Sequence, residues 1–209
     1  MSVENELLKL QKGQLRHDEL AHKDILCLPV QMRIKHMVLH FAKYTGHLVE
    51  ARQLQSHELL VSTILDTWII MLASANMLNL RLSEKLNPEG GCAYQHLDSL
   101  GQAFADSHFI SPNDVYDVSL FELGKITGRM AKACESLDHM EGFASRESLE
   151  EGVIAIARLL LGVSALLKIN VQPLISYRWI EVERKSIFHQ PEDDGSIHKD
   201  IFIDAAKLI

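Results

Sequence analysis

The chain has 209 residues, of which 47% are hydrophobic and 23% are charged, and its formal net charge is −7. This length fits one domain with enough apolar material for a sizeable core. The acidic balance, without any block of Lys and Arg, argues against general nucleic-acid binding. Three scattered cysteines with no CxxC spacing favour reduced thiols in a cytoplasmic protein.

The first part of the chain predicts three helices. An amphipathic helix covers about residues 4–22, and a long helix follows Pro29 to about residue 55. Ser56 is a suitable N-cap for a third helix, residues 56–80, which is apolar on nearly every side. Such a helix belongs in the middle of a bundle. Its one central charge, Asp66, needs a partner there, either a metal ion or a basic side chain, because an isolated buried carboxylate is costly.

Residues 56–80 are long enough to span a membrane, but they include charged and small polar residues, and the start of the chain lacks the pattern of a signal peptide. The sequence therefore predicts a soluble protein with no membrane partner.

The second part of the chain repeats this pattern. The segment NPEGG, residues 87–91, is a stop signal, and Ser111 to Asp114 is a start signal for a helix reaching about residue 139. A short helix is expected at 94–105, before this start signal, and a loop at 142–148, after the helix that it begins. A nearly all-apolar helix follows at 149–169 and has one interior charge, Arg158. Asn170 and Pro173 begin a shorter helix, and a polar tail covers 188–209. No stretch alternates as a strand would. The fold predicted is an all-α antiparallel bundle of six or seven helices, with the two apolar helices at its centre.

An internal repeat supports this arrangement. Residues 43–51 read KYTGHLVEA and residues 125–133 read KITGRMAKA, and each is followed by a loop and an apolar helix with a single charge. The shared order predicts a duplicated two-helix unit, with repeats at about 29–86 and 112–187, in one domain covering residues 1–209.

These motifs resemble those of the all-α NTP pyrophosphohydrolases, the group that contains MazG and the dimeric dUTPases. KYTGHLVEA lies over the family pattern EExGELxEA, and DTWIIMLASANMLNL over its second motif, which places Asp66 on the family's aspartate. LLKLQ near the N-terminus is similar to the leading helix of the dimeric dUTPases. The resemblance implies a homo-oligomeric, Mg²⁺-dependent enzyme that cleaves nucleoside triphosphates between the α and β phosphates.

Most acidic positions of the family are replaced in this chain. The two carboxylates of the family's first helix fall on Tyr44 and His47, and in the second copy on Ile126 and Arg129. The ExxD pair falls on Thr63 and Asp66, then on Gly152 and Ala155. Magnesium requires several hard oxygen ligands. A reduced metal site would use Asp66, Glu50, Glu58 and His47.

The alternative is a pseudoenzyme, a nucleotide-sensing or protein-interaction helical module that needs no cofactor. In that interpretation a basic residue neutralises Asp66, and the duplication makes Arg129 and Arg158 the candidates. The residues expected to hold a phosphate directly are Lys43, Lys125, Arg129 and Arg158. Whether the protein is an enzyme stays open at this point, and a purely structural helical protein is the third possibility.

Other candidate groups are weaker. His36 and His40, spaced i and i+4, suit a transition metal, but HExxH is absent and the sequence names no third ligand. An acidic group at helical spacing suits either a helix start or a displaced magnesium site, and it comprises Glu122, Glu147, Glu150 and Glu151.

Overall fold

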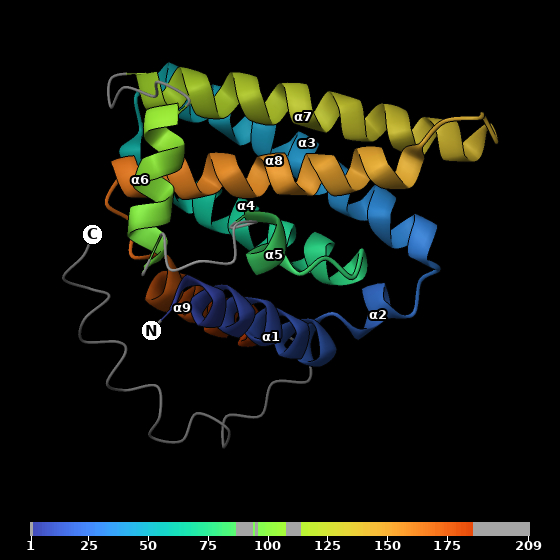
Figure 1. Ribbon diagram of the computed structural model, residues 1–209, viewed down its shortest axis with the longest axis horizontal. Helices are drawn as coiled ribbons and strands as arrows, with labels where there is room; N and C mark the ends of the chain where they lie inside the picture. Colours follow the sequence, from blue (N-terminus) through green and yellow to red (C-terminus); the bar gives the residue numbers. More distant parts are fainter. Residues whose placement is uncertain (1, 87–93, 95, 108–113, 186–209) are drawn as a thin grey trace.

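The computed structural model describes residues 2–86, 94, 96–107 and 114–185, and all regular structure within these ranges is helical (Figure 1). The helices are α1 (Val3–Ala21), α2 (Lys23–Leu26), α3 (Val30–Leu54), α4 (His57–Met77), α5 (Leu82–Leu86), α6 (Leu97–Ser107), α7 (Val115–Asp138), α8 (Ser145–Leu166) and α9 (Val171–Glu183). The predicted all-α bundle is confirmed, although the described residues form nine helices and not six or seven, because the short α2 and α5 were not expected as separate helices.

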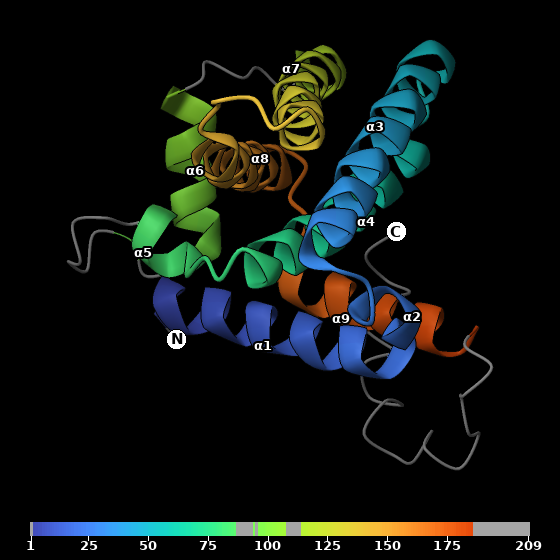
Figure 2. The ribbon, with the colours of Figure 1, turned by 90° about the vertical axis from the view of Figure 1, so that its right-hand side faces the viewer.

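Two antiparallel helix hairpins form the centre of the bundle. α3 pairs with α4 and α7 pairs with α8, while α3 also packs on α7 and α4 on α8 (Figures 1 and 2). α4 and α8 carry long runs of buried side chains, as their all-round apolar sequences predict. Trp68 of α4 is fully buried, and its Nε1 donates to Ser164 Oγ of α8 at 3.0 Å, which joins the two central helices.

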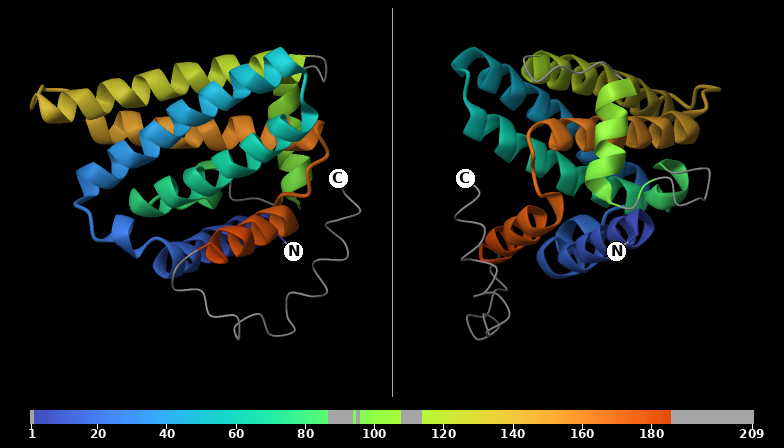
Figure 3. Two further views of the ribbon diagram at one scale, coloured as in Figure 1. Left: turned by 180° about the vertical axis from the view of Figure 1, so that it is seen from behind. Right: turned by 60° about the vertical axis from the view of Figure 1, so that its left-hand side comes forward.

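The N-terminal and C-terminal helices form a further layer beside this centre. α1 packs on both α4 and α9, and α9 also touches α4 (Figure 3). On the other side α6 crosses α8 closely at Gly101, where an added Cβ would lie 2.6 Å from the Leu161 carbonyl oxygen. The layer of α1 and α9 matters for function because it covers one end of the α3–α4 hairpin.

All four central helices end in the same kind of left-handed turn. The residues in these turns are Gln55, Asn79, Met140 and Lys168, with φ between 51° and 56°. In each turn the next residue donates its N–H to the carbonyl five positions earlier, as in a Schellman motif. At the start of α4 the Ser56 side chain accepts from the Leu59 N–H at 3.2 Å, so the predicted N-cap is confirmed.

Several helix boundaries differ from the sequence prediction: α4 ends at Met77 and not at residue 80, α6 covers Leu97–Ser107 and not 94–105, and the largest difference is at the start of α8. α8 begins at Ser145, within the segment expected to be a loop. Arg146 accounts for this extra turn, because its Nε donates to Glu150 at 2.7 Å and its Nη2 to the Leu78 carbonyl at 2.9 Å. The signals at 87–91 and 111–113 and the tail at 188–209 lie outside the described residues. The internal duplication and the oligomeric state stay predictions.

Within the described ranges, α4 is long and apolar enough to cross a membrane, and α8 with α9, bent by 108°, would pass the same test as one broken span. However, 61% of the apolar window of α4 is buried inside the bundle, as in the core helix of a soluble protein. The structure is compatible with the predicted soluble protein, and its cytoplasmic location stays a prediction.

Candidate functional site

A pocket of about 280 Å³ lies between α1, α2, α3, α4 and α9. We call it the histidine pocket, because His17, His22, His36 and His40 line it. Asp66 is also on its wall. The one central charge of the apolar α4 helix therefore faces a pocket, on the side of α4 that the other hairpin does not cover.

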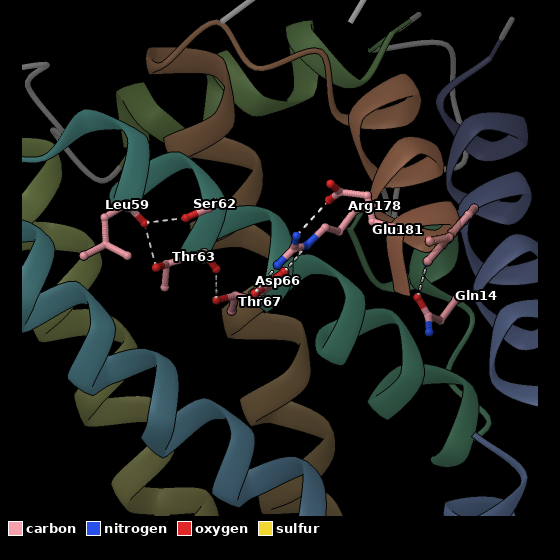
Figure 4. A network of polar contacts seen from close by, with 9 residues as sticks. Gln14, Leu59, Ser62, Thr63, Asp66, Thr67, Arg178 and Glu181 are labelled. Atoms are coloured by element: carbon pink, nitrogen blue, oxygen red, sulfur yellow. Dashed lines mark hydrogen bonds and ion pairs between the residues drawn. The ribbon is translucent and has the colours of Figure 1, made fainter. Parts of the chain in front are cut away.

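The partner of Asp66 is Arg178 of α9 (Figure 4). Arg178 Nε donates to Asp66 Oδ1 at 2.8 Å and Nη2 to Oδ2 at 3.2 Å, while Nη1 donates to Glu181 at 2.8 Å. The hydrogen bond to Asp66 raises the pKa of the Arg178 guanidinium. Of the two partners that the sequence allowed for Asp66, a metal ion or a basic side chain, the structure has a basic side chain. It is Arg178, and not Arg129 or Arg158 as predicted.

The hydroxyl groups near Asp66 are engaged inside α4 itself (Figure 4). Thr63, which stands where the family has the first acid of ExxD, is buried and donates to the Leu59 carbonyl at 2.7 Å. Thr67 donates in the same way to the Thr63 carbonyl at 2.6 Å. The hydrogen bonds of both hydroxyls are therefore made within α4, and neither side chain adds an anionic ligand beside Asp66.

The imidazoles of the pocket lie close together. His36 Nε2 and His40 Nε2 are 3.0 Å apart, and the His17 and His22 ring centroids are 5.3 Å apart. Burial lowers the pKa of His40 to about 4, with Lys43 and His36 acting in the same direction, and burial also lowers the pKa of His22. Both rings are therefore neutral at neutral pH.

His17 is almost fully enclosed. Only 2% of this residue is exposed, and its Nδ1 lies 2.9 Å from Glu183 Oε1 on α9. The ring stacks on Trp179, with centroids 6.1 Å apart. Its buried Nε2 has no hydrogen-bond partner in the described part of the chain. Buried polar atoms usually have a hydrogen-bond partner, so this nitrogen is a candidate contact for a ligand.

Arg33 supplies positive charge to the same pocket. Its Nε is buried and makes no hydrogen bond among the described residues, and no ion pair is formed by its guanidinium within them. Asp18 lines the same pocket; burial raises the pKa of its carboxyl to about 6, so it is mostly ionised at neutral pH, and Gln14 Nε2 donates to it at 2.8 Å. Arg33 is thus the cation of this pocket that suits an anionic group, while Asp18 and Asp66 are the acids on the same lining.

The four predicted metal ligands are not gathered around the pocket. Asp66 lines it, but Glu50 and Glu58 are exposed on their helices, and His47 lies half-buried beside Tyr44 with ring centroids 5.9 Å apart. Among the residues that the structure describes, no three His, Cys, Asp or Glu side chains are arranged to hold one metal ion. Both oxygens of Asp66 accept from Arg178, so the residues present fit magnesium poorly. Magnesium binding stays a prediction.

Two of the predicted phosphate ligands come together elsewhere. Arg129 and Arg158 line a pocket of about 520 Å³ between α7 and α8, which we call the arginine pocket. Both side chains are exposed, and the Arg158 guanidinium lies 5.9 Å from the Phe104 ring centroid. Of the other two, Lys125 is paired with Glu122 at 2.8 Å, and Lys43 lies 4.5 Å from the Tyr44 ring centroid.

The acidic group that the sequence singled out does not form a separate site within the described residues. Glu122 is held by Lys125, and Glu150 by Arg146 at 2.7 Å. Asp117, which also borders the arginine pocket, is held by two donors of Arg52 at 2.7 and 3.1 Å. The carboxylates around that pocket are thus largely neutralised by their own partners.

No protein-family model matches this chain, and no match was found among curated proteins or solved structures. The resemblance to the NTP pyrophosphohydrolases accordingly rests on its short motifs. Sequence reasoning missed His17, His22, Arg33 and Arg178 as pocket residues. The i, i+4 spacing marked His36 and His40, but no comparable local signal points to Arg178, which is 112 residues from Asp66.

Proposed function

We propose that the protein binds a nucleotide, or a similar small anionic molecule, in the histidine pocket without hydrolysing it. The observation that carries this proposal is the two-pronged contact of Arg178 with Asp66 on the pocket wall. An aspartate held in this way is a poor metal ligand, because both of its oxygens are already hydrogen-bonded to a cation. The chain is thus a pseudoenzyme of the pyrophosphohydrolase kind that keeps a ligand pocket.

The charge of Arg33 supports an anionic ligand. Arg33 presents a partly buried guanidinium with no ion-pair partner in the described ranges, and the Arg fork suits phosphate. The volume, about 280 Å³, lies just below the usual range for small-molecule sites, roughly 300–1,000 Å³. This volume suits a phosphate group with part of its nucleoside better than a whole nucleoside triphosphate.

Calorimetry with a panel of nucleoside triphosphates, each with and without magnesium, tests this proposal, and each mixture is then assayed for released pyrophosphate. We expect binding without release. Arg33→Ala should weaken binding about tenfold or more, because it removes a charge-assisted contact. The matched control is Arg16→Ala, an exposed arginine on α1 outside the pocket lining, and it should bind as the unaltered protein does.

Other outcomes would overturn the proposal in distinct ways. Magnesium-dependent release of pyrophosphate would restore the enzyme interpretation. Binding that survives Arg33→Ala but is lost in the Arg129→Ala and Arg158→Ala double variant would move the ligand to the arginine pocket. If no nucleotide binds, the protein-interaction interpretation replaces the nucleotide one.

A further inference from the structure

The two half-buried histidines on α3 face each other with an unusual geometry. His36 and His40 are one helical turn apart, and their rings meet edge to face at a centroid distance of 4.6 Å. The closest atoms are the two Nε2 nitrogens, which lie 3.0 Å apart and share a hydrogen bond in the absence of a metal ion. Both side chains line the histidine pocket.

This separation matches the distance between two imidazole nitrogens bound to one metal ion. With metal–nitrogen bonds of about 2.0–2.1 Å, angles between a square and a tetrahedral arrangement give a nitrogen–nitrogen distance of about 2.9–3.4 Å. The observed 3.0 Å falls within this range. Binding through Nε2 places the ring proton on Nδ1; Nδ1 of His40 is buried and has no hydrogen-bond partner among the described residues, so this tautomer leaves its N–H unsatisfied there.

We propose that His36 and His40 form a binding site for a divalent first-row transition-metal ion of the Zn²⁺, Ni²⁺ or Cu²⁺ class. Two imidazole donors select these ions over Mg²⁺ and Ca²⁺, which prefer oxygen ligands. In the described part of the chain no third His, Cys, Asp or Glu completes the group. The other coordination positions therefore face the pocket and hold water or an anion beside Arg33.

Zinc titration by calorimetry, on protein without a histidine tag and first dialysed against a chelator, tests the site. We expect one Zn²⁺ per chain, and the spectrum of bound Cu²⁺ by electron paramagnetic resonance should show coupling to two imidazole nitrogens. His36→Gln and His40→Gln keep a polar side chain of similar size but remove the imidazole, and each should weaken zinc binding about 10- to 100-fold. His57→Gln is the matched control, since His57 is exposed at the start of α4, away from the pocket lining.

The result depends on comparing the variants with one another. Unchanged zinc affinity in both His36→Gln and His40→Gln would overturn the proposal, and so would an equal loss in His57→Gln. Thermal unfolding followed by circular dichroism shows whether each variant is folded, and either folded pocket variant is sufficient for the comparison. Because no nucleotide is present, this experiment can fail or succeed independently of the proposed nucleotide binding.

Discussion

The α3–α4 hairpin and the α7–α8 hairpin have the same arrangement of helices, but the central charge is acidic in the first and basic in the second. Each contributes one apolar central helix with one charge near its middle, and each borders a pocket. Tyr44 and Asp66 line the histidine pocket, while the residues that correspond to them in the predicted repeat, Ile126 and Ala155, line the arginine pocket. This correspondence supports the duplication, which stays a prediction.

The difference between the halves arises from what covers them. α1 and α9 pack over one end of the first hairpin, so Asp66 receives Arg178 as a partner and the nearby imidazoles are partly buried. Arg158 in the second half is exposed, and it reaches solvent. The packing of the hairpins thus determines where the pockets lie. The layer of α1 and α9 partly buries Asp66, which therefore needs a charged partner, whereas Arg158 stays in solvent and needs none.

The largest loss of stability is expected when the contact between the two hairpins, at Trp68, is removed. Trp68→Ala removes a fully buried indole and its hydrogen bond to Ser164, and it should lower the free energy of unfolding by about 4 kcal/mol. Urea denaturation measures this loss. Phe121→Ala is the control, because Phe121 is 64% exposed, and it should change stability by less than about 0.5 kcal/mol. Equal losses in the two variants would contradict the packing at the centre.

The next effect is specific to the covered pocket and depends on pH. Burial raises the pKa of Asp18 to about 6 from an unfolded value of 3.8, so the folded protein holds this proton more tightly. The resulting stabilisation is present below pH 3.8 and is lost as the pH rises through 6. Asp18→Asn stays neutral and keeps an oxygen that can accept from Gln14. It should therefore raise stability by roughly 2 kcal/mol at pH 7.5 and by little at pH 3.5.

Chemical denaturation of the two proteins at both pH values checks this prediction. The comparison of Asp18→Asn with the unaltered protein at each pH cancels the titration of other groups, including His40, whose lowered pKa makes stability fall as the pH drops below 6.5. A stability difference that is the same at pH 3.5 and pH 7.5 would show that burial does not shift the Asp18 pKa.

A smaller loss is expected from the charge pair itself. Asp66→Asn leaves Arg178 with Glu181 as its acid and weakens the contact between α4 and α9, at a cost of roughly 1–2 kcal/mol because the pair is only partly buried. Glu50→Gln changes an exposed carboxylate that the sequence also proposed as a metal ligand, and it should cost less than about 0.5 kcal/mol. Thermal unfolding at low and high salt measures both, and a larger loss for Glu50→Gln would refute this assignment.

The sequence was informative wherever a feature depends on neighbouring residues. Long, nearly all-apolar runs located the two central helices, α4 and α8, and the Ser56 cap was correct. The spacing of His36 and His40 correctly placed them on one face of α3. What could not be predicted depends on contacts across the fold: Arg178 meets Asp66 only because α9 folds back on α4, and the pocket exists because α1 and α2 cover α3 there. Helical periodicity contains no information about such pairings.

The smallest expected effects test whether the two hairpins are equivalent within the helices that carry KxTG. Gly46 and Gly128 occupy the same place in the repeat, in the interiors of α3 and α7, and a Cβ added to either would meet nothing within 4 Å. Gly46→Ala and Gly128→Ala should each stabilise the protein by about 0.5–1 kcal/mol, because alanine favours the helix more than glycine does. Gly152→Ala is the contrasting variant and should destabilise, since its Cβ would lie 2.6 Å from Met130 Cγ and that side chain must move.

Urea denaturation and nucleotide calorimetry on the same three variants separate stability from function. Equal gains at Gly46 and Gly128 would mean that the glycines serve no packing role in either half. Neither glycine lines the histidine pocket, so both variants should bind nucleotide as the unaltered protein does. A loss of binding in Gly46→Ala alone would contradict the placement of the ligand in that pocket and would show that the two hairpins differ in function where their structures agree.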